Sequence, residues 1–187
     1  MANGFYTSSS AYKVQFEGTV ASNMTRVVWG NWGPPKCKLF AWLVIMNRVW
    51  TADWLRRRGW PNYNLCQLCK REPETAAHFL LHCRFSTRIW NAVKCWLVVQ
   101  ELDIATWAGI PTVKQWWEKT VLGRGHRRKA VSSLLMLVSW ELWNERNARV
   151  FQKKATMPTV VVNRIKAESR NWVLAGAKHM GYLMPRE

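Results

Sequence analysis

Three features of the sequence predict a mostly α-helical protein, an irregular helical domain in which a small metal-clamped loop lies between helices. Apolar residues recur at the three-to-four-residue spacing of helices along most of the chain. The alternation of apolar and polar residues that is typical of strands is scarce. Near the middle, three cysteines and a histidine, all residue types that bind metals, fall within eighteen residues.

Two helices are predicted before these cysteines. The first begins at Pro35, because proline at the first helical position loses no hydrogen bond, and its apolar residues indicate burial on most sides. Thr51 is expected to cap the second helix and Gly59 to end it. The helix dipole is a sufficient structural reason for the three arginines of its last turn, Arg56, Arg57 and Arg58.

Further helices are predicted after the cysteines. Ser86 is expected to cap the first of them, and Thr112 a short one that contains Trp116 and Trp117. Two longer helices follow, over about residues 127–151 and 158–175.

The charge balance favours a polyanionic partner. The 187-residue chain has 28 Lys and Arg against 11 Asp and Glu, a formal net charge of +17, which attracts nucleic acid first and an anionic membrane surface second. A solvated basic surface without a specific partner is the alternative. Fourteen tryptophans supply ample material for a core.

Several classes of protein are excluded or disfavoured. The longest apolar run, residues 39–46, is far shorter than the roughly 20 residues that span a bilayer, and no secretory signal is visible. We therefore expect a nuclear or cytoplasmic protein, in which five cysteines are thiols or metal ligands. The two aspartates, Asp53 and Asp103, cannot form the clustered carboxylates of two-metal polymerases and nucleases, so no such catalysis is expected.

The cysteine spacing predicts one structural Zn²⁺ ion. Cys66 and Cys69 are separated by two residues and can grip one ion from a tight turn; His78 and Cys83 follow closely and complete four ligands. An ion with four protein ligands has no open position and does not activate water. We expect the ion to hold the helix over residues 51–59 to the helix over residues 86–97.

Other interpretations of these residues are weaker. A redox-active cysteine pair would need a βαβ setting, which the sequence does not show. His78 and His82 have the spacing of zinc proteases, but Phe79 stands where their general base would be. His82 could replace His78 as a ligand, although it adjoins Cys83 and neighbouring residues rarely point into one small site. Two further cysteines are expected to be buried thiols on helix faces, Cys37 and Cys95.

Several motifs in the same order resemble the reverse transcriptase zinc-binding domain of plant non-LTR (LINE-type) retrotransposon polyproteins. They are Trp32-Gly-Pro-Pro-Lys-Cys-Lys-Leu-Phe-Ala-Trp-Leu43, then residues 48–55, then Cys66-x2-Cys69 with Glu74-Thr75-x2-His78-Phe79-Leu80-x2-Cys83. Residues 4–12 look like the lead-in of that family, and Trp140-Glu-Leu-Trp-Asn-Glu-Arg-Asn-Ala-Arg-Val-Phe151 is similar to a stretch that often follows the domain.

The resemblance implies zinc binding by Cys66, Cys69, His78 and Cys83. It also implies a non-catalytic helper role in handling the RNA or target DNA of the element, by a detached C-terminal fragment. We accordingly divide the chain into a lead-in segment (1–33), the zinc-binding domain (34–100), a linker region (101–125) and a C-terminal helical region (126–187).

Single-stranded RNA or DNA is the partner we expect, since it is bound by cations that contact phosphates and by exposed aromatic rings that stack on bases. Trp60 is the best candidate for stacking and Trp117 the second. The cationic candidates are Arg56, Arg57, Arg58, Lys70, Arg71, Arg84 and Arg88 around the cysteines, and Arg124, Arg127, Arg128 and Lys129 further on. The alternatives are a zinc-stabilised module that docks on a reverse transcriptase domain, and a retrotransposon remnant without function.

Overall fold

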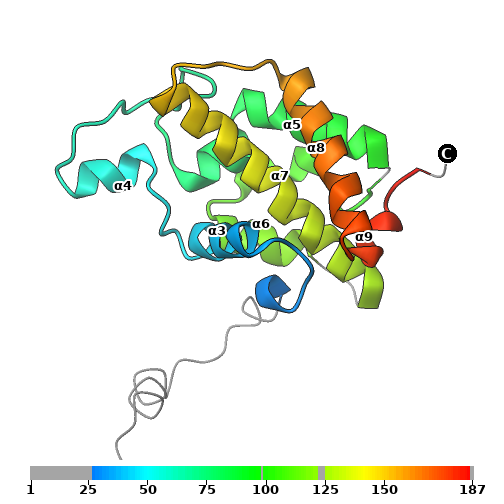
Figure 1. Ribbon diagram of the computed structural model, residues 1–187. Helices are drawn as coiled ribbons and strands as arrows, with labels where there is room; N and C mark the ends of the chain where they lie inside the picture. The colour runs from blue at the N-terminus through cyan, green and yellow to red at the C-terminus, as the bar shows by residue number, and fades with distance from the viewer. Residues whose placement is uncertain (1–26, 98, 122–124, 186–187) are drawn as a thin grey trace, which may run out of the picture.

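The computed structural model describes residues 27–97, 99–121 and 125–185, which are mostly helical (Figure 1). No β-strand occurs in these residues; Leu65 and Pro73 form one isolated antiparallel bridge. The predicted fold class is thereby confirmed. The helices are α3 (Pro35–Ile45), α4 (Ala52–Arg57), α5 (Arg84–Leu97), α6 (Val113–Thr120), α7 (Gly125–Phe151), α8 (Pro158–Leu174) and α9 (Lys178–Gly181), with a π-helical turn η1 (His78–His82) and a 3-10 turn η2 (Ile104–Gly109).

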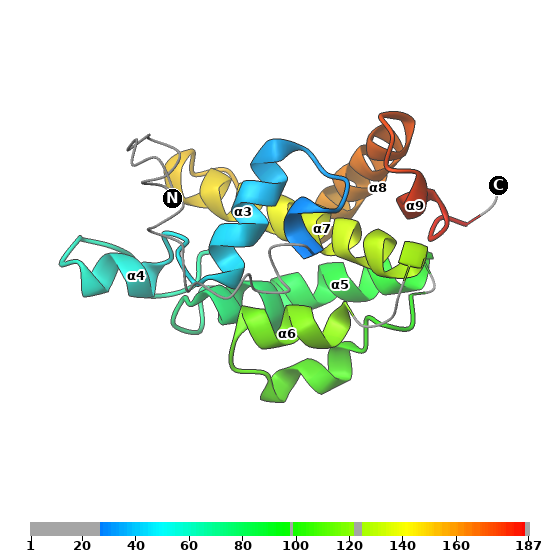
Figure 2. The same ribbon diagram turned by 90° about the horizontal axis from the view of Figure 1, so that it is seen from below.

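The longest helix, α7, is the centre of the fold. It packs against α3, α8 and α9, while α5 packs against α8 and α6 packs against α3; in the view from below, α5 and α6 are drawn beneath α7 (Figure 2). Its middle is apolar nearly all round, so several of its residues are fully buried: Leu134, Leu135, Met136, Leu137 and Leu142. None of the described helices is both long and apolar enough to cross a membrane.

Tryptophans form the core on the α5–α6 side. Trp90, Trp107 and Trp116 meet edge to face in every pairing, with ring centroids 5.2–5.5 Å apart, an arrangement that aromatic quadrupoles favour. Trp107 lies on η2 and Trp116 on α6, within the 101–125 region for which we predicted a linker. Trp117 is fully buried beside them, so its prediction as a surface for base stacking is wrong.

Several predicted helix boundaries agree with the structure and two caps do not. Thr112 caps α6 by accepting a hydrogen bond from the Gln115 N–H. Thr51 stands at the start of α4, but its hydroxyl donates to Asp53 instead of capping the backbone. Ser86 does not cap α5, because the helix already begins at Arg84 and the Ser86 hydroxyl bonds to the Phe79 carbonyl inside the core.

Two expectations about burial also need correction. Cys37 is buried as predicted, whereas Cys95 is exposed on α5. The α3 helix buries one face, but Leu39 is 51 % exposed, so this helix is less enclosed than its sequence suggests. The predicted lead-in segment falls mostly outside the described residues.

Candidate metal centre

Cys66 and Cys69 lie on a tight turn in the loop that follows α4. The Lys70 N–H donates to the Cys66 carbonyl at 2.7 Å, and the Cys66 N–H donates to the Glu72 carbonyl at 2.8 Å. Lys70 takes a left-handed backbone conformation with φ of 57°, which turns the chain back after Cys69. The two thiols therefore face the same space.

His78 and Cys83 stand at the two ends of the η1 turn. The Cys83 N–H donates to the His78 carbonyl at 2.8 Å, a five-residue closure that sets both side chains at one place. The chain then enters α5 directly at Arg84. This half of the site is thus fixed to the core of the protein, because Phe79, Leu80 and Leu81 of η1 are all buried.

The ligand atoms of the four residues all lie within 4.8 Å of one another. Cys66 Sγ is 3.9 Å from Cys83 Sγ, and Cys69 Sγ is 3.3 Å from His78 Nε2. A tetrahedral zinc ion with Zn–S bonds of about 2.3 Å sets its sulfurs about 3.8 Å apart, so the spacing and the donor set both fit zinc. His82 lies outside this cluster, with Nε2 3.2 Å from the Trp107 carbonyl oxygen.

Electrostatics in the cluster favour the thiolate, the form that binds a metal, at Cys83 but not at Cys66. Hydrogen bonding from the Cys66 thiol, and then from His78, lowers the pKa of Cys83 to about 4, while the same pairing with Cys83 raises the pKa of Cys66. Burial disfavours a charge on His78, but its contacts with Cys83 and Cys69 outweigh burial and raise its pKa. A metal ion must therefore displace protons from Cys66 and His78, and binding weakens in acid.

A buried carboxylate holds in place the loop between α4 and η1 (residues 58–77, the metal loop). The sequence placed this residue in a motif but gave it no role. Glu74, 1 % exposed, accepts the Ala52 N–H at 3.0 Å and so caps α4 in place of Thr51. The same carboxylate pairs with Arg146 of α7, with Nη2 2.6 Å from Oε1 and a further contact from Nε. The loop is thereby tied to α4 and α7, in addition to its direct continuation into α5.

Arg149 makes a second link from α7 to the metal loop. Its Nη1 donates to the Leu68 carbonyl, between the two cysteines of the turn, at 2.9 Å. Its Nε pairs with Glu145 at 2.8 Å, which orients the guanidinium. Arg146 and Arg149 both belong to the 140–151 motif. The motif order therefore indicated that this stretch accompanies the zinc-binding segment, but it did not indicate which residues are in contact.

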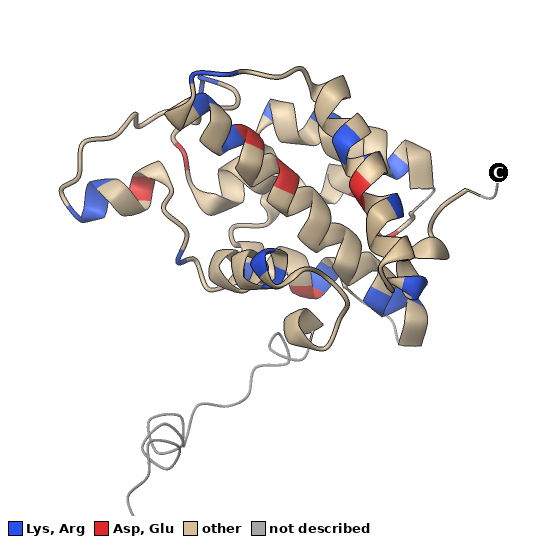
Figure 3. Ribbon diagram, viewed as in Figure 1, with Lys and Arg blue, Asp and Glu red and all other residues tan. Residues whose placement is uncertain are grey.

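The predicted cationic residues are divided between two distant surfaces (Figure 3). One is beside the metal loop and α4, where Arg56, Arg57, Arg58, Lys70, Arg71, Arg84 and Arg88 are all exposed. The other is at the start of α7, with Arg127, Arg128 and Lys129. The metal loop contacts α7 at Arg149, so the two surfaces are about 30 Å apart along that helix at about 1.5 Å per residue.

The two surfaces differ in their charge partners. Arg127 is held by both carboxylate oxygens of Glu101, which raises its pKa and neutralises part of its charge. Beside the metal loop, Arg57 makes a looser pair with Asp53 at 3.7 Å. Arg58 instead lies over the Trp50 ring, 4.8 Å from its centroid. Arg124 lies outside the described residues.

A helical fold with a closed Cys3His cluster on a loop between helices defines a small zinc-binding module. Residues 6–90 of the chain match the protein family described as zinc-binding in reverse transcriptase. The match supports a reverse transcriptase zinc-binding domain in this chain, which is an accessory domain and not the polymerase catalytic domain. No curated protein and no solved structure matches the chain.

Proposed function

We propose that this chain is a non-catalytic module of a LINE-type retrotransposon polyprotein of plant type, and that it binds single-stranded RNA or DNA without sequence preference. One Zn²⁺ ion, held by Cys66, Cys69, His78 and Cys83, stabilises the loop that carries part of the binding surface. With four protein ligands the ion has a structural role.

The observation that supports nucleic-acid binding is the combination of exposed cations and aromatic rings at the end of α4. Arg58 lies over Trp50, and Trp60, the predicted stacking residue, is 57 % exposed. Single strands are bound by this pairing of groups, because phosphates attract cations while bases stack on aromatic faces. A solvated basic surface would not need exposed tryptophans.

The origin of the chain suggests its partners and its place in the cell. A zinc-binding accessory domain acts beside a polymerase, so a reverse transcriptase domain is the second partner that we propose. Contact with the RNA or target DNA of an element places the protein in the nucleus or the cytoplasm.

Salt-dependent binding of a fluorescent single-stranded RNA tests the proposal. Each phosphate contact lowers the slope of log K against log salt by about 0.7 for a single strand. We expect the zinc-loaded protein to bind at low salt. The triple variant Arg56→Gln, Arg57→Gln, Arg58→Gln should bind more weakly, and its plot of log K against log salt should be less steep by up to about two units.

The matched control carries Arg127→Gln, Arg128→Gln and Lys129→Gln, three cations at the other surface. A larger loss in the control would move the binding surface to the start of α7. If the folded, zinc-loaded protein binds no RNA or DNA at low salt, the proposal is wrong and a docking module remains. The Cys66→Ser, Cys69→Ser variant shows whether binding depends on the metal loop.

A further inference from the structure

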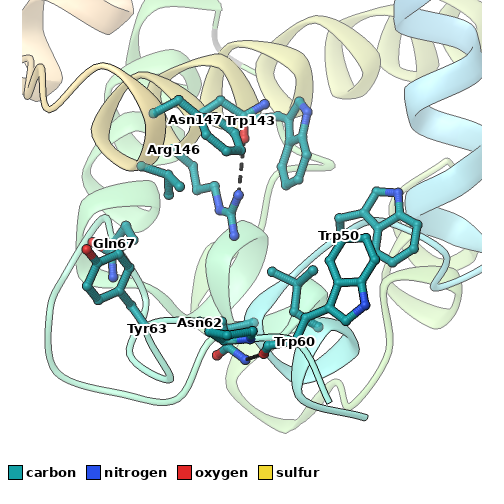
Figure 4. Close-up of a pocket in the computed structure, with 13 residues that line it drawn as sticks. Trp50, Trp60, Asn62, Tyr63, Gln67, Trp143, Arg146 and Asn147 are labelled. Atoms are coloured by element: carbon teal, nitrogen blue, oxygen red, sulfur yellow. Dashed lines mark hydrogen bonds between the residues drawn. The ribbon is translucent and has the colours of Figure 1, made fainter. Parts of the chain in front are cut away.

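A cavity of about 670 Å³ opens between α4, the segment that follows it and the end of α7 (Figure 4). Its size lies in the range of about 300–1,000 Å³ that is usual for small-molecule sites. Its lining is mostly apolar and aromatic and includes Trp50, Leu55, Trp60, Tyr63, Trp143 and Phe151. Gln67, between the two cysteines of the metal turn, also lines it, so the cavity adjoins the metal loop.

Stacked indoles form one wall of the cavity. The rings of Trp50 and Trp60 are nearly parallel, with an interplanar angle of 10° and centroids 5.6 Å apart. They remain 45 % and 57 % exposed, and Tyr63 on the opposite side is 62 % exposed (Figure 4). Exposed aromatic surface of this extent is uncommon in a monomeric protein unless a ligand covers it.

Asn62, one of the residues that line the cavity, has an unused hydrogen-bond acceptor. The Asn62 side-chain N–H donates to the Trp60 carbonyl at 2.9 Å, which leaves Asn62 Oδ1 as the free end of the amide. This oxygen is buried and accepts no hydrogen bond from any described residue. Arg146, at the other side of the cavity, is already paired with Glu74 and with Asn147. A buried polar atom without a partner is unfavourable, so a ligand with an N–H donor would satisfy Asn62 Oδ1 once the amide turned toward the cavity.

Cations contact two of the aromatic rings that line the cavity, Trp50 and Tyr63. Arg58 lies over Trp50, and Lys153 lies over Tyr63 with Nζ 5.1 Å from the ring centroid. None of the residues that line the cavity is acidic. A chain with a phosphate on each side of an inserted group matches this charge distribution, whereas an apolar peptide would use neither the cations nor Asn62.

We infer that the cavity takes up one unpaired nucleobase of a single strand, which stacks on Trp60 and donates an edge N–H to Asn62 Oδ1 while Arg58 and Lys153 contact the flanking phosphates. This inference rests on the proposed function and adds a site to it. Every nucleobase has an aromatic face and an N–H on its pairing edge, so the site accepts all bases. A base held in a duplex cannot enter it.

The test compares two oligomers of equal length and charge, thymidine 12-mer single-stranded DNA and the same strand with abasic positions, against the zinc-loaded full chain. We expect the abasic strand to bind more weakly at equal salt. Trp60→Ala should weaken binding of the base-bearing strand roughly 5- to 150-fold and leave the abasic strand unchanged. Trp29→Ala, at a tryptophan that is 44 % exposed outside the cavity, is the matched control.

Two further variants refine the assignment. Trp60→Phe should restore part of the affinity, since a smaller aromatic ring still stacks, and Asn62→Ala should weaken only the base-bearing strand. Zinc content and helicity, measured for each variant, show that the fold is intact.

The possible outcomes distinguish failure of the base site from failure of nucleic-acid binding as a whole. Equal binding of both strands by the unmodified protein would overturn the base site while leaving nucleic-acid binding in place. An equal loss on both strands in Trp60→Ala would also overturn it, because Trp60 would then support binding of the backbone and not of a base. Absence of binding to either strand would contradict the proposed function itself.

Discussion

At the scale of single residues, the metal centre depends on which histidine faces the thiols. His78 and His82 are four residues apart, and spacing alone left both as candidate ligands. The π-helical turn sets His78 Nε2 3.3 Å from Cys69 Sγ, whereas His82 faces the Trp107 carbonyl. The side-chain directions within this one turn therefore separate a ligand from its neighbour.

We predict that His78→Ala lowers the zinc content of the purified protein well below one ion per chain, while His82→Ala keeps one. The reason is that loss of His78 leaves three ligands, and loss of His82 removes only its contact with the Trp107 carbonyl. Metal analysis of both variants, purified together, is the measurement. Zinc retained by His78→Ala and lost by His82→Ala would reverse the assignment.

At the scale of elements, the metal loop is held by buried ion pairs from α7. Glu74 and Arg146 are 1 % and 5 % exposed in their side chains, so neither charge has water to replace its partner. Burying such a pair gives little net stability over an apolar pair, but breaking it leaves an unpaired buried charge. The pair therefore fixes the position of the metal loop, because moving the loop away would leave a buried charge unpaired.

We predict that Arg146→Met lowers the free energy of unfolding by about 3–5 kcal/mol, because Glu74 is left charged and unpaired. The double variant Arg146→Met, Glu74→Gln should recover part of that loss. Urea unfolding of the zinc-loaded proteins measures both. Arg57→Met, which removes an exposed cation with a 3.7 Å pair, is the control and should change stability by less than about 1 kcal/mol.

Two glutamates one turn apart on α7, Glu141 and Glu145, have pKa values shifted in opposite directions, so they should affect the pH dependence of stability in opposite ways. Burial would raise the pKa of Glu145, but hydrogen bonds from the Thr156 N–H and Arg149 outweigh it and hold this pKa below its usual value. The carboxylate of Glu145 thus stabilises the fold above the ordinary pKa of about 4.3, and the effect is lost as pH falls through the lowered pKa. Burial raises the pKa of Glu141, so its charge opposes folding near neutral pH.

We predict that Glu145→Gln destabilises the protein at pH 7 by about 1.5–3 kcal/mol, the worth of hydrogen bonds to a charged group, and that its difference from the unmodified protein shrinks below about pH 4. Glu141→Gln should be neutral or stabilising at pH 7. Urea unfolding at a series of pH values measures both variants, and all share the same metal site. An equal loss from the two substitutions at pH 7 would contradict the prediction.

At the scale of the whole molecule, the metal loop and the helical body contribute to stability differently. The loop has few apolar residues of its own and depends on four ligands, Glu74 and two arginines. The body has a continuous core in which α7 packs on α3, α8 and α9, with contacts such as Trp32 against Trp172 at 5.6 Å between ring centroids. Metal binding therefore supplies folding free energy mainly to the loop and to α4.

We predict that chelation of zinc exposes residues 52–77 to rapid amide hydrogen exchange while α7 and α8 stay protected. Loss of the ion removes the closure of the loop, but it leaves the apolar contacts of the helical body. Exchange measured by mass spectrometry on metal-loaded and chelated protein gives the comparison. Uniform loss of protection along the chain would show that the metal is needed for the whole fold.

The sequence by itself determined the class of fold, because helical spacing of apolar residues is a local property that survives without knowledge of contacts. It also determined the four candidate ligands, since a metal in a short loop constrains residues that are close in the chain. It indicated correctly that Trp60 is exposed, but it could not determine that Glu74 meets Arg146, seventy-two positions away, or that Trp117, the second stacking candidate, is buried. Those outcomes depend on how α7 packs against the metal loop and how α6 packs against α3. In the sequence alone, a buried tryptophan on a short helix cannot be told from an exposed one.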